Sequence, residues 1–290
     1  MTAPIEVHAV PAADGTVYDA ALQPVGTVSP FAALTGTSVA STDLQAPAAG
    51  LVAEERDRAA EVARQLTTTV REYSNNRPRS LQRRIGPSEV GNPCTRKLGY
   101  KLAGVEPVNT TGGDPWAAFV GTATHAELET VFKGRPGWAT EVRVRVDDEL
   151  ELAGSCDLIR LTGGVTVIDH KVVGAATMRK ARTQGPADYY VTQANLYAHG
   201  LISMGVPAEW VAIAYWPRSG RLVDLYVWLQ RYDQAVAEAG LQRLDTLRKL
   251  IGLGGLSVLG QLPTAEHYCD GCDFYRPGAT DPTVACGGAR

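Results

Sequence analysis

Hydrophobic and polar positions along the chain follow two different periods, which predict helices on both sides of a group of strands. Val62, Leu66 and Val70 share one face at i, i+4, i+8 spacing, which is typical of an amphipathic helix. Residues 140–146 instead alternate valine with arginine, as a half-buried strand does. Along the whole chain these periods predict helices over 52–73, 87–102, 114–132, 186–204 and 233–250, and strands over 140–146, 150–161, 165–173, 210–216 and 222–229. The order predicts a mixed α/β (α+β) fold, a central mixed sheet flanked by helices.

Composition sets the broad class of protein. The chain has 290 residues, of which 44% are hydrophobic and 20% charged, so a sizeable core can form. Residues 1–50 carry four acids and no lysine or arginine, and we expect a poorly ordered acidic leader there, followed by a single domain over 51–290. Neither a secretory signal nor a membrane-spanning stretch is evident, so we expect a cytoplasmic protein without membrane contact.

Charge is distributed unevenly along the chain. The net charge is 28 minus 31, or −3, which excludes a polycationic protein. Residues 71–101 nevertheless hold eight cations and two acids, a local charge of +6 that suits a polyanion. An ordinary solvated surface is the alternative. The candidate nucleic-acid contacts in this stretch are Arg83, Arg84, Arg96 and Lys97.

Two predicted neighbouring strands carry acidic residues and a lysine. Asp169 and Lys171 point to the same face of their strand, and Asp157 can approach Asp169 across the hairpin. Two carboxylates amid valines and isoleucines need a cation, and Mg²⁺ or Mn²⁺ prefers such oxygen ligands. A structural ion pair between Asp169 and Lys171 is the simpler alternative.

Five cysteines occur in a chain with no export signal, where disulfides seldom persist. Cys269 and Cys272 have the C-x-x-C spacing that is common to zinc and iron–sulfur sites. Cys286 follows near the C-terminus, and Cys94 lies far upstream. Cys156 precedes Asp157 and is expected to be a small buried hydrophobic residue.

Four short motifs occur in order, and together they resemble the PD-(D/E)xK nuclease superfamily. The resemblance covers roughly residues 84–290 and is greatest to RecB-type exonucleases and their CRISPR-associated iron–sulfur relatives. The matching segments are Gly121-Thr-Ala-Thr-His125, Gly154-Ser-Cys-Asp157, Asp169-His-Lys171 and Gln193-Ala-Asn-Leu-Tyr197.

The resemblance implies a role for each matching residue. It implies metal binding by the side chains of His125, Asp157 and Asp169 and by the backbone carbonyl of His170. It makes Lys171 the catalytic lysine, working with the two aspartates, while Gln193 and Tyr197 steady that lysine or a DNA phosphate. Glu141 and Glu129 are weaker candidates for the same site.

The resemblance also implies a 4Fe–4S cluster held by Cys94, Cys269, Cys272 and Cys286. Such a cluster would join Cys94 to the C-terminal segment 264–290. The last two cysteines are further apart than the family pattern, with 13 residues between them. Zn²⁺ is the alternative metal, and His267 is a weak substitute ligand.

A divalent-metal-dependent DNA exonuclease acting on single-stranded ends is therefore the expected function, in a bacterial or phage-infected cell. The alternative is a DNA-processing adaptor in CRISPR spacer acquisition or phage recombination, in which binding to DNA and to partner proteins matters more than turnover. A zinc-stabilised binding protein without cleavage is a third possibility.

Overall fold

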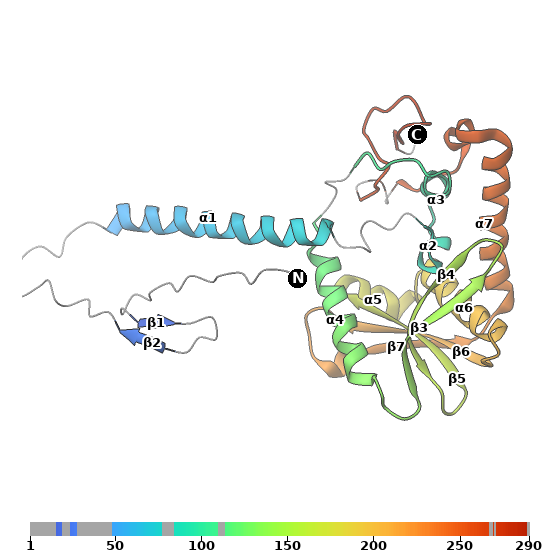
Figure 1. Cartoon of the computed structure of the whole chain (residues 1–290), viewed down its shortest axis with the longest axis horizontal. Helices are drawn as coiled ribbons and strands as arrows, with labels where there is room; N and C mark the ends of the chain where they lie inside the picture. Colours follow the sequence, from blue (N-terminus) through green and yellow to red (C-terminus); the bar gives the residue numbers. More distant parts are fainter. Residues whose placement is uncertain are drawn as a thin grey trace, which may run out of the picture. The chain divides into compact units, whose positions relative to one another are not determined.

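A computed structural model describes residues 16–18, 24–27, 48–76, 84–109, 114–266, 269 and 271–288 (Figure 1). The chain divides into two compact units, residues 1–64 and 65–290. The first unit contains a two-stranded antiparallel pair, β1 (Thr16–Tyr18) and β2 (Pro24–Thr27), and the beginning of helix α1 (Ala48–Asn75). The pair was not predicted, because runs of three and four residues are too short for a period to show. Most of the predicted leader lies outside the described residues.

One five-stranded sheet organises the second unit, in the order β3-β4-β5-β6-β7 (Figure 1). Its strands are β3 (Trp138–Asp147), β4 (Leu152–Arg160), β5 (Val165–Val173), β6 (Ala208–Pro217) and β7 (Tyr226–Arg231). Neighbouring strands are antiparallel except β5 and β6, which are parallel. The expected mixed α/β fold with a mixed sheet is confirmed.

Helix α6 (Asp188–Ser203) is the central helix of the core. It contacts β3, β5 and β6 of the sheet on one side and helix α7 (Gln234–Gly254) on another. A Cβ at Gly200 would lie 2.6 Å from the carbonyl oxygen of Arg145 on β3, so a larger residue would not fit there. Helix α4 (Trp116–Phe132) contacts β3, β4 and β5. The sheet and these helices hold the site residues described below.

Two predicted elements were wrong in part. The helix predicted over 87–102 is two helices, α2 (Pro87–Val90) and α3 (Thr95–Leu102). Pro93 disfavours helical backbone at Asn92, whose side-chain Oδ1 instead accepts the amide of Cys94 at 2.9 Å. The strand predicted over 222–229 begins as the 3₁₀ turn η1 (Leu222–Asp224), and β7 follows it.

Helix α5 (Ala175–Gln184) was missed by the sequence analysis. Only Met178 and Ala181 of its ten residues are buried, so its apolar period is weak. The helix begins directly after β5, the strand that carries Asp169 and Lys171. It carries three exposed cations, Arg179, Lys180 and Arg182, and no acid.

The C-terminal segment packs against α3, after the 3₁₀ helix η2 (Gly255–Gln261) that follows α7. The Tyr100 hydroxyl donates to the Pro282 carbonyl at 2.5 Å, and its ring stacks on Phe274 with centroids 5.1 Å apart. The Arg96 guanidinium donates to the carbonyl of Gly260 at 2.8 Å and to that of Leu262 at 3.1 Å. Within the described ranges, no helix is both long enough and apolar enough to cross a bilayer.

Candidate active site

Asp157 and Asp169 lie where strands β4 and β5 separate. The pairing register between these strands runs from Arg160–Thr166 to Leu158–Ile168. One step further along the register Asp157 would face Asp169, but the described strands no longer pair there. The two carboxylates therefore lie at a split between β4 and β5, although β5 stays paired with β6 at Asp169.

Strand β3 is also distorted beside Asp157. Residues on either side of Glu141 pair with β4, but Glu141 itself, which would face Asp157, does not. Its backbone has φ of 47°, a left-handed conformation that is uncommon for a residue other than glycine. Such strain clusters at functional sites. Glu141 is exposed and would face Asp157 in the register, so both a supporting acid of the site and a surface carboxylate fit its position.

His125 of α4 contacts Asp157 of β4. Its Nδ1 lies 3.5 Å from Oδ1 of Asp157, while Oδ2 of the same carboxylate accepts the His170 amide at 2.8 Å. Burial lowers the pKa of His125, but the hydrogen bond and charge of Asp157 outweigh it and raise the pKa above its usual value. Burial raises the pKa of Asp157, yet His125, the His170 amide and Lys171 together lower it. The two residues thus stabilise each other's charged forms.

Lys171 connects Asp169 to helix α6. Its Nζ lies 2.7 Å from Oδ2 of Asp169 and donates to Oε1 of Gln193 at 3.1 Å. Asp169 is only 2% exposed, and this burial, with the charge of Asp157, raises its pKa to about 6 although Lys171 opposes the shift. Despite the ion pair, Oδ2 of Asp169 receives no hydrogen bond of acceptable geometry from the described residues. A buried carboxylate oxygen is thus left able to accept another donor or a cation.

The His170 side chain points away from Lys171 and is kept neutral. Trp216 on β6 donates its indole N–H to Nδ1 of His170 at 3.1 Å, so Nδ1 carries no proton. Burial, reinforced by the charges of His125 and Lys171, lowers the pKa of His170 to about 4 although Asp157 opposes the shift. The ring packs edge-on to His125, with centroids 5.8 Å apart. This leaves the imidazole of His170 as packing for the site.

The residue types at the site suit a divalent metal, but the spacing of their side chains does not form a ready-made metal site. An imidazole, two carboxylates and a buried oxygen without a hydrogen bond are suitable ligands for a hard or borderline cation. Among the described residues, however, no three His, Cys, Asp or Glu side chains lie close enough together to hold an ion. The predicted ligands are therefore neighbours, and their binding of Mg²⁺ or Mn²⁺ stays a prediction.

The other site predictions are placed as follows. Tyr197 is buried in the core, and a Cβ at Gly154 would lie 2.8 Å from its hydroxyl, so the tyrosine packs on the glycine of the Gly-x-x-Asp strand. Glu129 forms an ion pair with Lys133 at 3.2 Å. Cys156 is fully buried, its Sγ faces the Leu158 carbonyl, and burial raises its thiol pKa well above the usual value. This position agrees with the expectation that Cys156 is a small buried hydrophobic residue.

Three of the four cysteines predicted to hold a cluster are buried. Cys94 precedes α3, and Cys272 and Cys286 lie in the segment packed on that helix. Arg96 approaches Cys286 with Nη1 3.8 Å from Sγ, and burial raises the pKa of the Cys272 thiol. The described cysteines do not converge on a common point close enough for a metal. The helix and segment are held together by protein contacts, and the cluster stays a prediction.

The candidate DNA contacts have different surroundings. Arg83 lies outside the described residues. The Arg84 side chain is 81% exposed and approaches Glu151 at 4.0 Å. Arg96 donates to the backbone carbonyls of Gly260 and Leu262, at the end of η2, and Lys97 lies 3.9 Å from Asp273 with 23% of its side chain exposed. Arg84 is thus well placed to reach a phosphate, whereas Arg96 serves the fold.

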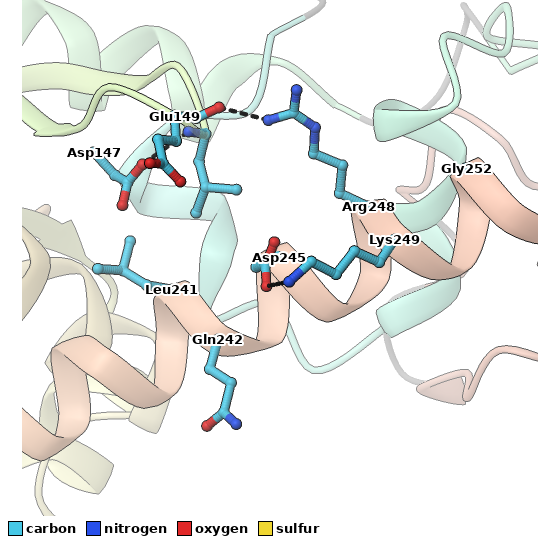
Figure 2. A pocket seen from close by; sticks show the side chains of 9 residues that line it. Asp147, Glu149, Leu241, Gln242, Asp245, Arg248, Lys249 and Gly252 are labelled. Atoms are coloured by element: carbon cyan, nitrogen blue, oxygen red, sulfur yellow. Dashed lines mark hydrogen bonds and ion pairs between the residues drawn. The ribbon is translucent and has the colours of Figure 1, made fainter.

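Two of the cavities in the second unit are relevant to the site. One, of about 640 Å³, lies between α7 and the β3–β4 turn and contains none of the predicted site residues (Figure 2). Its two cations are engaged within it, Lys249 with Asp245 at 2.6 Å and Arg248 with the Glu149 backbone carbonyl. The other, of about 630 Å³, borders Tyr190, over whose ring Lys171 lies. Tyr190 and Trp216 were not identified from the sequence, because no motif marks an aromatic that packs on a site.

Comparisons with known proteins give a partial likeness of fold. No protein-family model matches the chain, and no curated protein matches it. Among solved structures, LHK-Exo in complex with dAMP has a TM-score of 0.45 at 13% identity, over 59% of this chain and 89% of that one. The alkaline exonuclease LHK-Exo from Laribacter hongkongensis has a TM-score of 0.42 at 13% identity, over 61% and 95%. SSO0001 has a TM-score of 0.43 at 17% identity, over 73% and 93%. These values assign no activity to the chain.

Proposed function

We propose that this protein is a divalent-metal-dependent DNA exonuclease of the PD-(D/E)xK type. The observation that carries the proposal is the meeting of Asp157 and Asp169 at the split between β4 and β5, with Lys171 and His125 against them. A fold gains no stability from a buried carboxylate beside a second, half-buried one, because each must be desolvated and they repel. Their retention beside a lysine suits a site that stabilises charge on a phosphate.

His125, Asp157, Asp169 and the His170 carbonyl would hold Mg²⁺ or Mn²⁺, which would activate water and offset charge on the phosphodiester. Lys171 keeps its ammonium at the mouth of the split, because Asp169 and Gln193 contact it from two sides. The lysine can there donate to a phosphate oxygen. Tyr197 acts through packing on β4, and so supports the strand that carries Asp157.

DNA with single-stranded ends is the proposed substrate. The cations of residues 71–101 with exposed side chains, Arg84 among them, would contact phosphates. Cleavage should therefore weaken steeply as salt rises, since each phosphate contact releases condensed counterions.

The test is cleavage of end-labelled linear single-stranded DNA in Mg²⁺ or Mn²⁺, with a circular strand of the same sequence. We expect the linear strand to be shortened, the circle to be spared, and Lys171→Ala to lose activity. Lys249→Ala is the matched control, because that lysine pairs with Asp245 at the remote cavity. Cutting of the circle would show that the protein is an endonuclease rather than an exonuclease. No cleavage by the wild-type protein would favour the DNA-processing adaptor.

We also propose that Cys94, Cys269, Cys272 and Cys286 bind a 4Fe–4S cluster, with Zn²⁺ as the alternative. The support is the thiol donor set and the packing of the segment containing three of these cysteines on the helix that follows Cys94. Protein purified without oxygen should contain iron and acid-labile sulfide in about equal amounts. Zinc without sulfide would identify the alternative. A protein that contains neither iron nor zinc would contradict the proposal. Cys156→Ser is the control and should keep its iron and sulfide, because that thiol lies buried on β4 and is not one of the four proposed ligands.

A further inference from the structure

The 630 Å³ cavity is lined by Tyr190, the residue over whose ring Lys171 lies. Its walls come from the α2–α3 link, from α5 and from the beginning of α6, and include Tyr190 and Tyr215. The Lys171 ammonium lies 4.6 Å from the centroid of Tyr190. Tyr215 is the register partner of Lys171 on the parallel strand β6. A ligand in the cavity would thus be held next to the lysine that we place at the phosphate.

Aromatic rings form one side of the cavity. The rings of Tyr189 and Tyr190 meet edge to face with centroids 4.3 Å apart, and Tyr190 meets Tyr215 in the same way at 6.4 Å. Flat rings of this kind accept any nucleobase by stacking. A pocket of several hundred Å³ also has the size that a nucleotide needs. The cavity therefore offers stacking surfaces for a base close to the proposed site of cleavage.

Helix α5 contributes one cation, Lys180, to the lining of the cavity. Helix α5 contains three cations and no acid, and Lys180 lines the cavity together with the amide side chain of Gln184. Lys180 is exposed, whereas Arg182 is engaged with the Asp224 carbonyl at 2.7 Å and with the Tyr226 ring. Asp188 is the one acid in the lining. Lys180 can pair with a phosphate while Gln184 offers both a donor and an acceptor to a base edge.

The tyrosine wall is held in place by close packing. A Cβ at Gly91 would lie 2.6 Å from Cα of Tyr189 and 2.9 Å from its Cβ. The α2–α3 link therefore approaches the first turn of α6 as nearly as backbones allow. Tyr189 is half-buried by this packing, so its ring is positioned before any ligand arrives.

We propose that this cavity binds an unstacked nucleotide of single-stranded DNA next to the scissile phosphate, with Tyr189 stacking on the base and Lys180 pairing with a phosphate. The proposal rests on the proposed nuclease function. A base inside a duplex is covered by its neighbours on both faces, so it cannot enter. The cavity thereby gives a physical reason for a preference for single-stranded ends.

The test measures binding of a single-stranded oligonucleotide carrying 2-aminopurine, in chelator so that no strand is cut. Stacking in the wild-type protein should quench the fluorescence. Tyr189→Ala should relieve the quenching and weaken binding by roughly 5- to 100-fold, the range that one stacked base contributes. Tyr189→Phe keeps the ring and should retain both. Circular dichroism of each variant establishes that it folds.

Lys180→Ala gives a second test on an exposed residue. It should weaken binding and reduce the slope of log Kd against log salt by about one phosphate contact, whereas Lys249→Ala should change neither. Wild-type affinity and quenching in folded Tyr189→Ala protein, or equal quenching with duplex DNA, would overturn the proposal. Cleavage in Mg²⁺ is scored separately. Quenching by a wild-type protein that cuts no DNA removes the nuclease proposal alone, and cleavage by a protein that passes no binding test removes the cavity proposal alone.

Discussion

Gln193 and Lys171 are joined across the boundary between helix and sheet, with Oε1 of Gln193 accepting a hydrogen bond from Nζ of Lys171 at 3.1 Å. Gln193 is buried on α6, and Lys171 lies on β5. The same ammonium is 2.7 Å from Asp169. The lysine is thus held by two partners from different elements, and its position depends on how α6 packs on the sheet.

Replacement of Gln193 by alanine should therefore slow DNA cleavage without abolishing it. We expect a loss of about 10-fold, less than the 100-fold or more expected for Lys171→Ala, because Asp169 still holds the lysine. The measurement is the initial cleavage rate of linear single-stranded DNA. Gln234→Ala is the control, because that exposed glutamine pairs only with Glu238 on the surface of α7. Equal rates for Gln193→Ala and wild type would contradict a positioning role.

Asp169 and His170 should make the metal-free protein respond to pH in opposite directions. The folded Asp169 has a pKa of about 6 against 3.8 normally, so it keeps a proton that the unfolded chain has lost. Stability then falls as pH rises from about 4 to 6. The folded His170 has a pKa of about 4 against 6.5 normally, so only the unfolded chain takes up the proton. Its contribution to stability rises with pH from about 4 to 6.5.

Each effect is on the order of 3 kcal/mol and the two oppose each other, so the wild-type free energy of unfolding should change less between pH 4 and 6 than that of a variant lacking either group. Asp169→Asn should leave a free energy of unfolding that rises with pH, and His170→Gln one that falls. Urea unfolding in chelator across this range measures all three proteins. Slopes of the same sign in the two variants would show that Asp169 and His170 do not control the pH dependence of the free energy of unfolding.

Gly200 and Gly121 should respond differently to alanine. A Cβ at Gly200 would meet Val144 at 2.5 Å and the Arg145 carbonyl at 2.6 Å, so α6 would have to move away from β3. Gly200→Ala should lower the free energy of unfolding by about 3 kcal/mol or more. A Cβ at Gly121 meets no atom within 4 Å, so Gly121→Ala should be neutral or stabilise α4 by up to about 1 kcal/mol. Thermal unfolding of the two variants measures both effects. An unchanged stability of Gly200→Ala would contradict the close packing of α6 on β3.

Arg96 and Arg84 form a second matched pair. Arg96 donates to the Gly260 and Leu262 carbonyls, and Arg96→Ala should destabilise the protein by about 2–3 kcal/mol and expose the C-terminal segment to protease. Arg84 is 81% exposed, so Arg84→Ala should leave stability unchanged and weaken DNA binding instead. Proteolysis and a DNA-binding titration separate the two effects. A stable Arg96→Ala protein with weakened DNA binding would restore the original prediction of a phosphate contact.

Local pattern was sufficient for most elements of the second unit. Strand β5 runs over Val165–Val173, as its apolar run between turn signals predicts, and α4, α6 and α7 lie where helical spacing places them. Helix α5 escaped because only two of its residues are buried, which leaves too little period to detect. The α2–α3 break escaped because apolar spacing continues through Pro93 and hides the turn.

The sequence by itself was sufficient to select the candidate side chains for the proposed chemistry, because their types and order along the chain single out Asp157, Asp169, Lys171, His125 and Gln193. It also determined that Asp169 and Lys171 share a face, since strand alternation is a local property. Only the tertiary structure decided what surrounds them. It decided the split between β4 and β5, the contact of Gln193 with Lys171, the tyrosine wall beside Lys171 and the engagement of Arg96 with the Gly260 carbonyl. Each of these features joins residues that are far apart in the chain. Such contacts depend on how helices and strands pack, and no short-range period records that packing.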